Sequence, residues 1–244
     1  ELGFASMKLP NSEEVGIIDV PGHRDFIGNM LAGIGGIDAV LLVVAADEGV
    51  SAQTREHLAI VDLLDIKRGV IVLTKTDLVQ DPDWLELVSM DIRELVQPTS
   101  LATAPIVSVS ARTGFAIPEL LDQIEITLNG IPSRKDLGKP RLPVDRVFTL
   151  TGFGTVVTGT LLDGSLKIGD EVVCLPRGKT GRIRGLQNHH HKLQKIDPGF
   201  RAAVNIVNLS LQDIERGDVI AHPGDYKPTN LLDAHFRLLK DSPF

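Results

Sequence analysis

The sequence has few of the residues and segments that mark secreted or membrane-bound proteins. Its 244 residues include one cysteine, Cys174, which excludes an internal disulfide framework and fits a reducing compartment. The longest apolar run, residues 39–46, is too short to span a bilayer, and no signal peptide is present. We therefore expect a cytoplasmic protein that makes no membrane contact.

The sequence also lacks a phosphate-binding loop. The pattern G-x-x-x-x-G-K-[ST], whose backbone cradles nucleotide phosphates, does not occur anywhere in the chain. The first residue is Glu1 and not methionine, so we expect the sequence to be a fragment of a longer protein.

Charge is distributed unevenly between the two halves. Residues 1–129 contain 8 Lys/Arg and 20 Asp/Glu, and residues 130–244 contain 17 and 12, so the halves carry net charges of −12 and +5. The basic excess is densest at residues 177–201, which contain seven Lys/Arg and one acidic residue. The asymmetry indicates two domains, and the second either binds a polyanion such as RNA or carries a solvated basic face.

The first half alternates β-branched apolar runs, typical of strands buried on both faces, with amphipathic stretches. This alternation predicts an α/β domain with a mostly parallel sheet over residues 1–134. One helix would have Asp81 as its N-cap and Pro82 at its first position. The predicted strands are residues 1–7 (paired with the next), 15–20, 39–45, 69–74 and 105–109, and the predicted helices are 53–64, 83–96 and 118–128.

The second half changes character after a linker rich in proline and glycine at residues 130–143. Short strands punctuated by glycine then predict a small all-β barrel over residues 135–228. Residues 231–239 have strand character, so residues 229–244 are predicted to begin a third β domain. The predicted barrel strands are residues 144–150, 155–161, 171–175, 182–186, 202–207 and 219–221.

Two motifs follow predicted strands of the first domain. Asp19-Val20-Pro21-Gly22-His23 comes after the strand at 15–20, and Thr74-Lys75-Thr76-Asp77 comes at the end of the strand at 69–74. Because the carboxyl ends of parallel strands meet at one sheet edge, both motifs are expected there. A metal and phosphate contact beside a base reader is the arrangement of a nucleotide switch.

These motifs, with Ser110-Ala111-Arg112 and the barrel segments 152–160 and 169–172, resemble the translational GTPases of the elongation factor Tu group. Within that group the chain is most similar to the bacterial selenocysteine-specific factors. The resemblance covers nearly the whole chain. It implies a partial P-loop GTPase domain, without the phosphate and effector loops, followed by a translation-factor barrel.

The resemblance implies roles for the first motif. Asp19 would hold Mg²⁺ through a water molecule, and the Gly22 N–H would bind the γ-phosphate of GTP, so that hydrolysis to GDP releases the segment after it. His23 would orient the attacking water, where other GTPases use glutamine.

The second motif would read the base. One carboxylate, that of Asp77, can accept two N–H bonds from guanine, whereas adenine presents an acceptor there; each charge-assisted bond contributes about 1.5–3 kcal/mol. Lys75 would lie along the base, and the Ala111 N–H, between Ser110 and Arg112, would meet the guanine carbonyl oxygen. Most GTPases have asparagine at the position of Thr74, whereas the selenocysteine-specific members often have threonine there.

The resemblance also implies an aminoacyl pocket between the two domains. It would be formed by Asp145, Arg146 and Phe148, where elongation factor Tu carries an acidic pair, and by Arg201. A selenol is an anion at neutral pH, so two guanidinium groups would favour selenocysteinyl-tRNA over its seryl precursor. The alternative is that both arginines are surface residues in salt bridges.

The function implied is a GTPase that carries selenocysteinyl-tRNA to the ribosome, with an mRNA hairpin as a further partner through a region outside this sequence. Other interpretations are an ordinary aminoacyl-tRNA carrier, a sulfate-activating GTPase, or a module that binds tRNA or protein without hydrolysing nucleotide. The 244-residue chain alone is expected to bind GTP and GDP very weakly and to be inactive, because the phosphate loop supplies most phosphate contacts.

Overall fold

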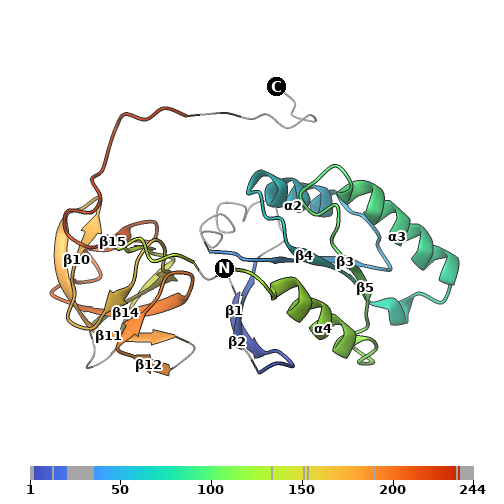
Figure 1. The fold of residues 1–244 in the computed structure, drawn as a ribbon, viewed down its shortest axis with the longest axis horizontal. Helices are drawn as coiled ribbons and strands as arrows, with labels where there is room; N and C mark the ends of the chain where they lie inside the picture. The colour runs from blue at the N-terminus through green and yellow to red at the C-terminus, as the bar shows by residue number, and fades with distance from the viewer. Residues whose placement is uncertain are drawn as a thin grey trace.

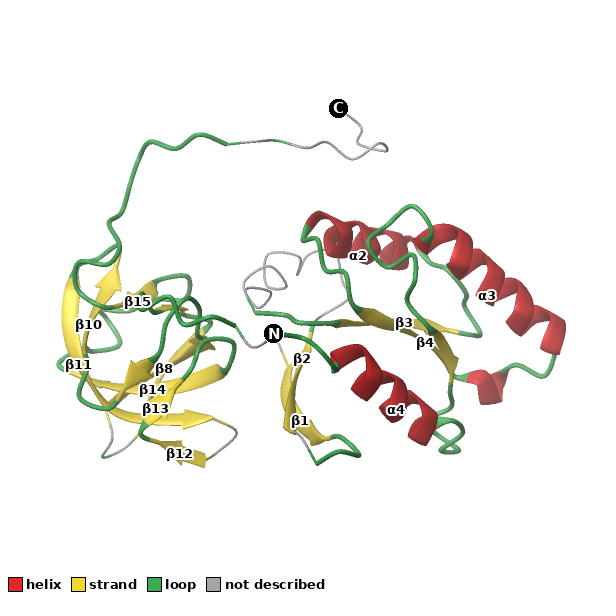
Figure 2. Cartoon of the chain, in the orientation of Figure 1, coloured by secondary structure: helices red, strands yellow, loops and turns green. Residues whose placement is uncertain are grey.

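The computed structural model describes residues 3–12, 14–20, 36–132, 134–150, 152, 154–188, 191–234 and 236. Figure 1 shows an α/β part formed by the first half of the chain beside an all-β part formed by the second. Among the described residues, α-helices occur only in the first part (Figure 2). The predicted fold class, a parallel-sheet domain followed by a translation-factor barrel, is confirmed.

Three parallel strands form the sheet of the α/β part. Their order is β3 (Val40–Ala45), β4 (Gly69–Thr74) and β5 (Ile106–Ser108). The central strand β4 is buried on both faces, as its continuous run of apolar residues predicts. All three strands therefore end at one edge of the sheet.

Helices cover the two faces of β4 (Figure 2). Ile71 and Leu73 pack with α2 and α3 on one face, while Val70 and Val72 pack with α4 on the other, as the two-residue period of a strand requires. The helices are α2 (Ala52–Leu63), α3 (Pro82–Val96) and α4 (Ile117–Leu128).

The helix starts follow from local chemistry. Asp81 caps α3 by accepting a hydrogen bond from the Asp83 N–H at 3.0 Å, with Pro82 in the first turn, so the predicted cap is confirmed. A capping box between Ser51 and Thr54, which the sequence analysis missed, starts α2.

The first two strands form an antiparallel hairpin, β1 (Gly3–Lys8) and β2 (Glu14–Asp19). Their pairing confirms the predicted one. The prediction that residues 15–20 are buried on both faces is wrong, because β2 is half exposed and, within the described residues, pairs with β1 alone. Val15 packs with Leu9 in the cluster that α4 covers, so only one side of the hairpin is protected.

The all-β part is a curved antiparallel sheet in the order β6-β15-β10-β11-β14-β8-β7, with β12 beside β11. The sheet closes on itself where β6 lies against β8. A Cβ on Gly159 of β8 would stand 2.1 Å from the Pro143 carbonyl oxygen of β6, so only glycine allows this approach. The strands are β6 (Arg141–Pro143), β7 (Arg146–Leu150), β8 (Gly154–Thr160), β9 (Leu166–Lys167), β10 (Glu171–Leu175), β11 (Lys179–Asn188), β12 (His191–Leu193), β13 (Lys195–Ile196), β14 (Arg201–Val207) and β15 (Val219–Ala221).

All six predicted barrel strands are present, and β10 and β15 have the predicted bounds. The sequence analysis missed β6, β9, β12 and β13, each only two or three residues long, because such segments are too short to show a period. The described residues 231–234 of the predicted strand at 231–239 have no strand structure. The domain limits at 134/135 and 228/229 stay predictions.

The linker between the two parts is fixed to both of them. Arg134 forms an ion pair with Asp38 of the α/β part, with Nη2 at 3.0 Å from Oδ1. The same side chain lies against Gly199 of the barrel, where a Cβ would stand 3.1 Å from Cδ of Arg134.

None of the helices that the structure describes has the length and apolar character needed to span a membrane.

Asp218 of the barrel accepts several hydrogen bonds, and one of them comes from the buried thiol of Cys174. The Cys174 thiol donates to Oδ2 of Asp218 at 3.4 Å, and the same oxygen accepts from Nε of Arg177 at 3.1 Å and from the Glu215 N–H at 2.8 Å. Burial, and then the hydrogen bond to Asp218, raise the pKa of the thiol to about 12. The thiol is therefore protonated and shielded in the folded chain.

We predict that a thiol reagent modifies Cys174 in urea but not in the native chain at mildly alkaline pH. Because the folded pKa lies above the unfolded value of 9.0, the stability contributed by the thiol is intact below pH 9.0 and is lost as pH rises toward 12. The loss is at most about 1.4 kcal/mol per pH unit. Urea unfolding across this pH range measures the loss of stability, and Cys174→Ala is the control, because it has no thiol to ionise. A native thiol that reacts as fast as the unfolded one would contradict the conclusion that the thiol is protonated and shielded.

Candidate functional site

The first candidate site is the sheet edge where β3, β4 and β5 end. Thr74, the last residue of β4, donates from Oγ1 to the Val44 carbonyl oxygen at 3.3 Å, which ties the end of β4 to β3. Lys75 then adopts a left-handed conformation (φ 59°) and the chain enters the 3-10 turn Thr76–Leu78, which carries Asp77. The turn presents the Asp77 carboxylate to solvent at the sheet edge.

The loops after β4 and β5 are joined by a side-chain hydrogen bond. Ser110 is buried, and its Oγ donates to Oδ1 of Asp77 at 2.6 Å while accepting from the Thr113 N–H at 3.1 Å. The Thr76 N–H also donates to the Val109 carbonyl oxygen at 3.3 Å. The structure thus brings Thr74, Lys75, Asp77 and Ser110 together, with Ala111 and Arg112 exposed directly after Ser110.

The third strand end contributes two carboxylates that the sequence analysis missed. Nζ of Lys75 lies 3.5 Å from Oδ1 of Asp47 and 3.5 Å from Oε1 of Glu48, in the loop after β3. Asp47, and then Glu48, raise the pKa of Lys75. Nε1 of Trp84 donates to the Ala46 carbonyl oxygen at 2.8 Å and so fixes this loop. The loop position directly after a predicted strand was the signal that could have identified these residues.

Asp19 is the last residue of β2 and is exposed. It pairs across the hairpin with Gly3, where a Cβ would stand 3.0 Å from Cβ of Asp19 and 3.3 Å from its Oδ2. The absence of a side chain at Gly3 therefore leaves room for the carboxylate. The other two residues predicted from this motif, Gly22 and His23, lie outside the described residues.

The second candidate site lies at the start of the barrel and is centred on a buried ion pair. Asp145 is 7% exposed, and both of its oxygens accept from the Arg201 guanidinium; Nη2 is 3.0 Å from Oδ1. Thr158 Oγ1 donates to Oδ1 of Asp145 at 2.6 Å and accepts from Nη2 of Arg201 at 3.1 Å. Two predicted pocket residues are thus joined, and Asp145 offsets the charge of Arg201.

The remaining predicted pocket residues lie on β7. Arg146 and Phe148 are two positions apart on this strand, so they share one face of the sheet, and both are exposed. Their cross-strand partners on β8 are Thr158 and Val156. Asp145, Arg146 and Arg201 together carry one net positive charge.

An aromatic ring from the α/β part reaches this site. The Phe4 ring of β1 lies against both arginines, with Cζ of Arg201 3.4 Å from the ring centroid and Cζ of Arg146 5.5 Å from it. Both distances are within the range of cation–π interactions. The sequence analysis assigned Phe4 no role in the site, since nothing local connects β1 with the barrel.

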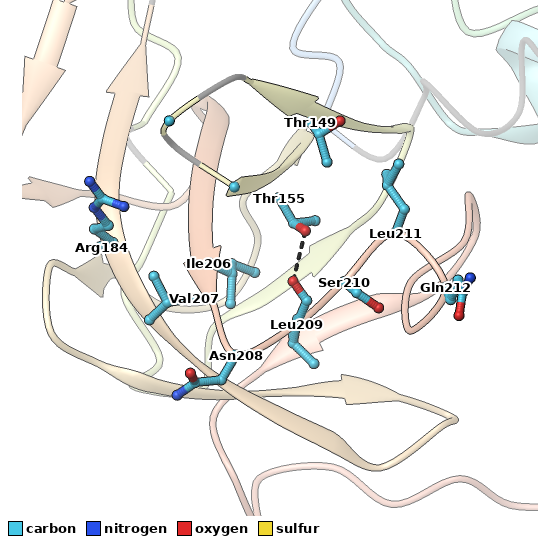
Figure 3. A pocket seen from close by; sticks show the side chains of 12 residues that line it. Thr149, Thr155, Arg184, Ile206, Val207, Asn208, Leu209, Ser210, Leu211 and Gln212 are labelled. Carbon is cyan, nitrogen blue, oxygen red and sulfur yellow. Dashed lines mark hydrogen bonds between the residues drawn. The ribbon is translucent and has the colours of Figure 1, made fainter.

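The barrel also has an open cavity of about 640 Å³, which Figure 3 shows from close by. Its lining includes Thr149, Arg184 and the segment from Ile206 to Gln212. Two of the lining residues are joined by a hydrogen bond: Thr155 donates from Oγ1 to the Leu209 carbonyl oxygen at 2.7 Å (Figure 3). None of the predicted site residues lines this cavity.

Comparison with protein families accounts for both parts of the chain. Residues 3–129 match the family described as the elongation factor Tu GTP binding domain, and residues 154–221 match elongation factor Tu domain 2. The first match alone covers more than half of the chain, which therefore belongs to the elongation factor Tu family of GTP-binding proteins.

Individual relatives are more specific. The chain is 48% identical to the selenocysteine-specific elongation factor of Desulfomicrobium baculatum, over its whole length and 38% of that protein. It is 39% identical to the protein of the same name from Escherichia coli K12, over 89% of the chain and 35% of that protein. The chain thus spans between a third and two fifths of these relatives.

Solved structures agree. A crystal structure of bacterial selenocysteine-specific elongation factor EF-Sec superposes with a TM-score of 0.85 and 36% identity, over 91% of this chain and 38% of the other. Elongation factor SelB from Methanococcus maripaludis, in complex with the GTP analogue GppNHp, gives a TM-score of 0.86 and 32% identity, over 91% of this chain and 49% of the other.

Proposed function

We propose that the intact protein is a GTP-dependent elongation factor that binds selenocysteinyl-tRNA, delivers it to the ribosome in the cytoplasm, and hydrolyses GTP after delivery. The observation that carries the proposal is the pair of arginines, Arg146 and Arg201, held beside the hairpin of a GTP-binding domain. The names of the relatives support the same function. An mRNA hairpin is a further proposed partner, through a part of the protein outside this sequence.

We propose that the described sheet edge binds guanine. Asp77 would accept from the two N–H groups of the base, and Ser110 holds the carboxylate in place from the neighbouring loop. Lys75 would cover one face of the base with its aliphatic stem, because Asp47 and Glu48 hold its ammonium group at the side of the site. We assign the Ala111 N–H to the guanine carbonyl oxygen, with Thr74 and Arg112 as neighbours in the two loops.

The phosphate end of the site is assigned to the segment after β2. An exposed carboxylate suits Mg²⁺, which keeps several waters and uses one or two carboxylates with substrate phosphates, so Asp19 would hold it through water. The ion would neutralise charge on the phosphates. We propose that the Gly22 N–H binds the γ-phosphate and that His23 orients the attacking water.

The barrel site would hold the aminoacyl end of the tRNA. A selenol is ionised at neutral pH and a serine hydroxyl is not, so the positive charge of the site distinguishes the two cargoes. Asp145 would orient Arg201 and limit the total charge, and Phe148 would give the pocket an apolar wall on the face that it shares with Arg146.

Competition between selenocysteinyl-tRNA and seryl-tRNA for the GTP-bound intact protein tests the proposal. We predict that the wild type prefers selenocysteinyl-tRNA and that Arg146→Gln reduces this preference at least about tenfold, as expected for one charge-assisted hydrogen bond. Arg216→Gln, at an exposed turn of the barrel, is the matched control and should retain the preference. Equal affinity of the wild type for the two tRNAs would instead indicate an ordinary carrier or a different GTPase of the family.

A further inference from the structure

The loop after β3 is firmly anchored for a loop that carries two exposed carboxylates. Ala46 is completely buried, its N–H donates to the Thr74 carbonyl oxygen at 2.8 Å, and its carbonyl oxygen accepts from Nε1 of Trp84 at 2.8 Å. The first bond joins the loop to the end of β4, and the second joins it to α3. Asp47 and Glu48 therefore follow a backbone position that is fixed on two sides.

The two carboxylates meet the side chain of Lys75. Its Nζ lies 3.5 Å from Oδ1 of Asp47 and 3.5 Å from Oε1 of Glu48. The three side chains are between 33% and 66% exposed, and exposed ion pairs contribute little to the free energy of unfolding. The carboxylates are therefore better explained by where they hold the ammonium group than by what they add to stability.

The backbone of Lys75 is also constrained. Its φ of 59° lies in the left-handed region, which is unfavourable for a residue with a side chain and persists only where the surroundings hold it. The Leu78 N–H donates to the Lys75 carbonyl oxygen at 3.0 Å, and the Thr76 N–H donates to the Val109 carbonyl oxygen at 3.3 Å. Lys75 is thus fixed at its backbone and at its ammonium group, so the aliphatic stem between them has little freedom.

An ordered stem suits contact with the face of a base. A long side chain that is ordered before binding loses less conformational entropy when the ligand covers it. The edge of a purine carries the hydrogen-bonding groups that identify it, and its face carries none of them. Contact of the Lys75 stem with the face would therefore raise the affinity for any purine, whereas Asp77 reads the edge.

We propose that Asp47 and Glu48 are positioning residues of the nucleotide site, held in place by Trp84. They orient Lys75 and so set the affinity for the purine ring, while Asp77 alone selects guanine. The inference rests on the proposed function, since it concerns the same site. It adds a supporting layer, formed by the loop after β3 and by α3, that acts on affinity without acting on the choice of base.

The test uses the intact protein with Asp47→Asn and Glu48→Gln combined, because Nζ of Lys75 lies equally close to both carboxylates. Affinities for GDP and for inosine diphosphate are measured by competition with a fluorescent nucleotide. Inosine lacks the exocyclic amine of guanine, so it offers Asp77 one donor fewer, but it presents the same ring face to Lys75.

Two further variants complete the test. The control combines Asp65→Asn with Glu94→Gln and so removes the same two charges from exposed side chains; Asp65 lies in the turn before β4, at the opposite end of that strand from the site. Trp84→Phe examines the anchor, because it keeps an aromatic ring on α3 and removes the donor to the Ala46 carbonyl oxygen.

We expect the double variant at residues 47 and 48 to bind GDP and inosine diphosphate about twofold to tenfold more weakly than the wild type, the range for ordering one long side chain. The ratio of the two affinities should stay at the wild-type value. The difference from the wild type should narrow as salt rises from about 0.1 M to about 1 M, because the screening length falls from about 10 Å to about 3 Å. Trp84→Phe should weaken both nucleotides in the same proportion, and the control should behave as the wild type.

Wild-type affinity for both nucleotides in the double variant would overturn the inference. A changed ratio of the two affinities would also overturn it, because the carboxylates would then act on the edge of the base through Asp77. Wild-type affinity in Trp84→Phe would overturn the part assigned to the anchor. An intact wild-type protein that binds no GDP would instead refute the proposed function.

Discussion

Replacement of Asp77 by asparagine is expected to lower the affinity of the intact protein for GTP and GDP by at least about a hundredfold. In the proposed site guanine would present two N–H donors to this carboxylate, and each charge-assisted bond contributes about 1.5–3 kcal/mol. An amide has only one acceptor, and its NH₂ group would face a donor of the base. The substitution should impair recognition of the base and leave the loop structure intact. Oδ1 of the asparagine can still accept from Oγ of Ser110, as Oδ1 of Asp77 does at 2.6 Å.

Titration with fluorescent nucleotides measures this effect, and the nature of the base provides the decisive comparison. Xanthine has a carbonyl oxygen where guanine has its exocyclic amine, so the asparagine variant should bind xanthosine diphosphate better than the wild type does. Asp122→Asn, on the exposed side of α4, is the matched control with the same change of charge. Unchanged GDP affinity in the Asp77 variant would show that the base is read by another group.

Replacement of Asp145 by asparagine is expected to destabilise the barrel by about 3 kcal/mol, because it leaves Arg201 partly buried without its counter-ion. The Asp145 side chain is 5% exposed and accepts from Arg201 and Thr158, so water can replace the lost charge only in part. The same change should weaken the orientation of Arg201 in the proposed aminoacyl pocket. Urea unfolding followed by circular dichroism measures the stability of the barrel.

A second ion pair of the barrel supplies the control. Arg141 and Asp163 are 46% and 32% exposed, and an exposed pair of this kind contributes only about 0–1 kcal/mol. Asp163 also has a positive φ of 61°, which asparagine tolerates well, so Asp163→Asn adds no backbone strain. Equal destabilisation by the two substitutions would argue against a special contribution of the buried pair at Asp145.

Local sequence patterns predicted the elements whose residues have the same surroundings from one end of the element to the other, and the helix start that is set by neighbouring residues. The strand at β4 has the predicted bounds because helices cover both of its faces, so residues 70–73 are all apolar and buried. The start of α3 was also predictable, because Asp81 and Pro82 act within one turn of the helix. The hairpin strand β2 was misjudged as buried on both faces, because its apolar residues pack on one side only, against the cluster beneath α4.

The sequence predicted which residues meet at the first candidate site, but it did not predict the groups that support them. Asp77 and Ser110 follow adjacent parallel strands, and that order alone requires them to meet at one edge. The ion pairs of Lys75 with Asp47 and Glu48 were not predicted, because an isolated pair of carboxylates in a loop resembles any solvated surface.

Sequence patterns were enough to predict the order of the two domains, the strand ends at Asp19 and Thr74 with Asp77 just after the second of them, and the family to which the chain belongs. These features depend on residues close together in the chain and on the period of each element. The contact of Phe4 with Arg146 and Arg201, and the hydrogen bonds of Asp145 to Arg201, became evident only from the folded structure. The Phe4 contacts join residues of different domains, and the Asp145–Arg201 pair joins residues 56 positions apart within the barrel. Their geometry therefore exists only once each domain has folded and the two have packed together.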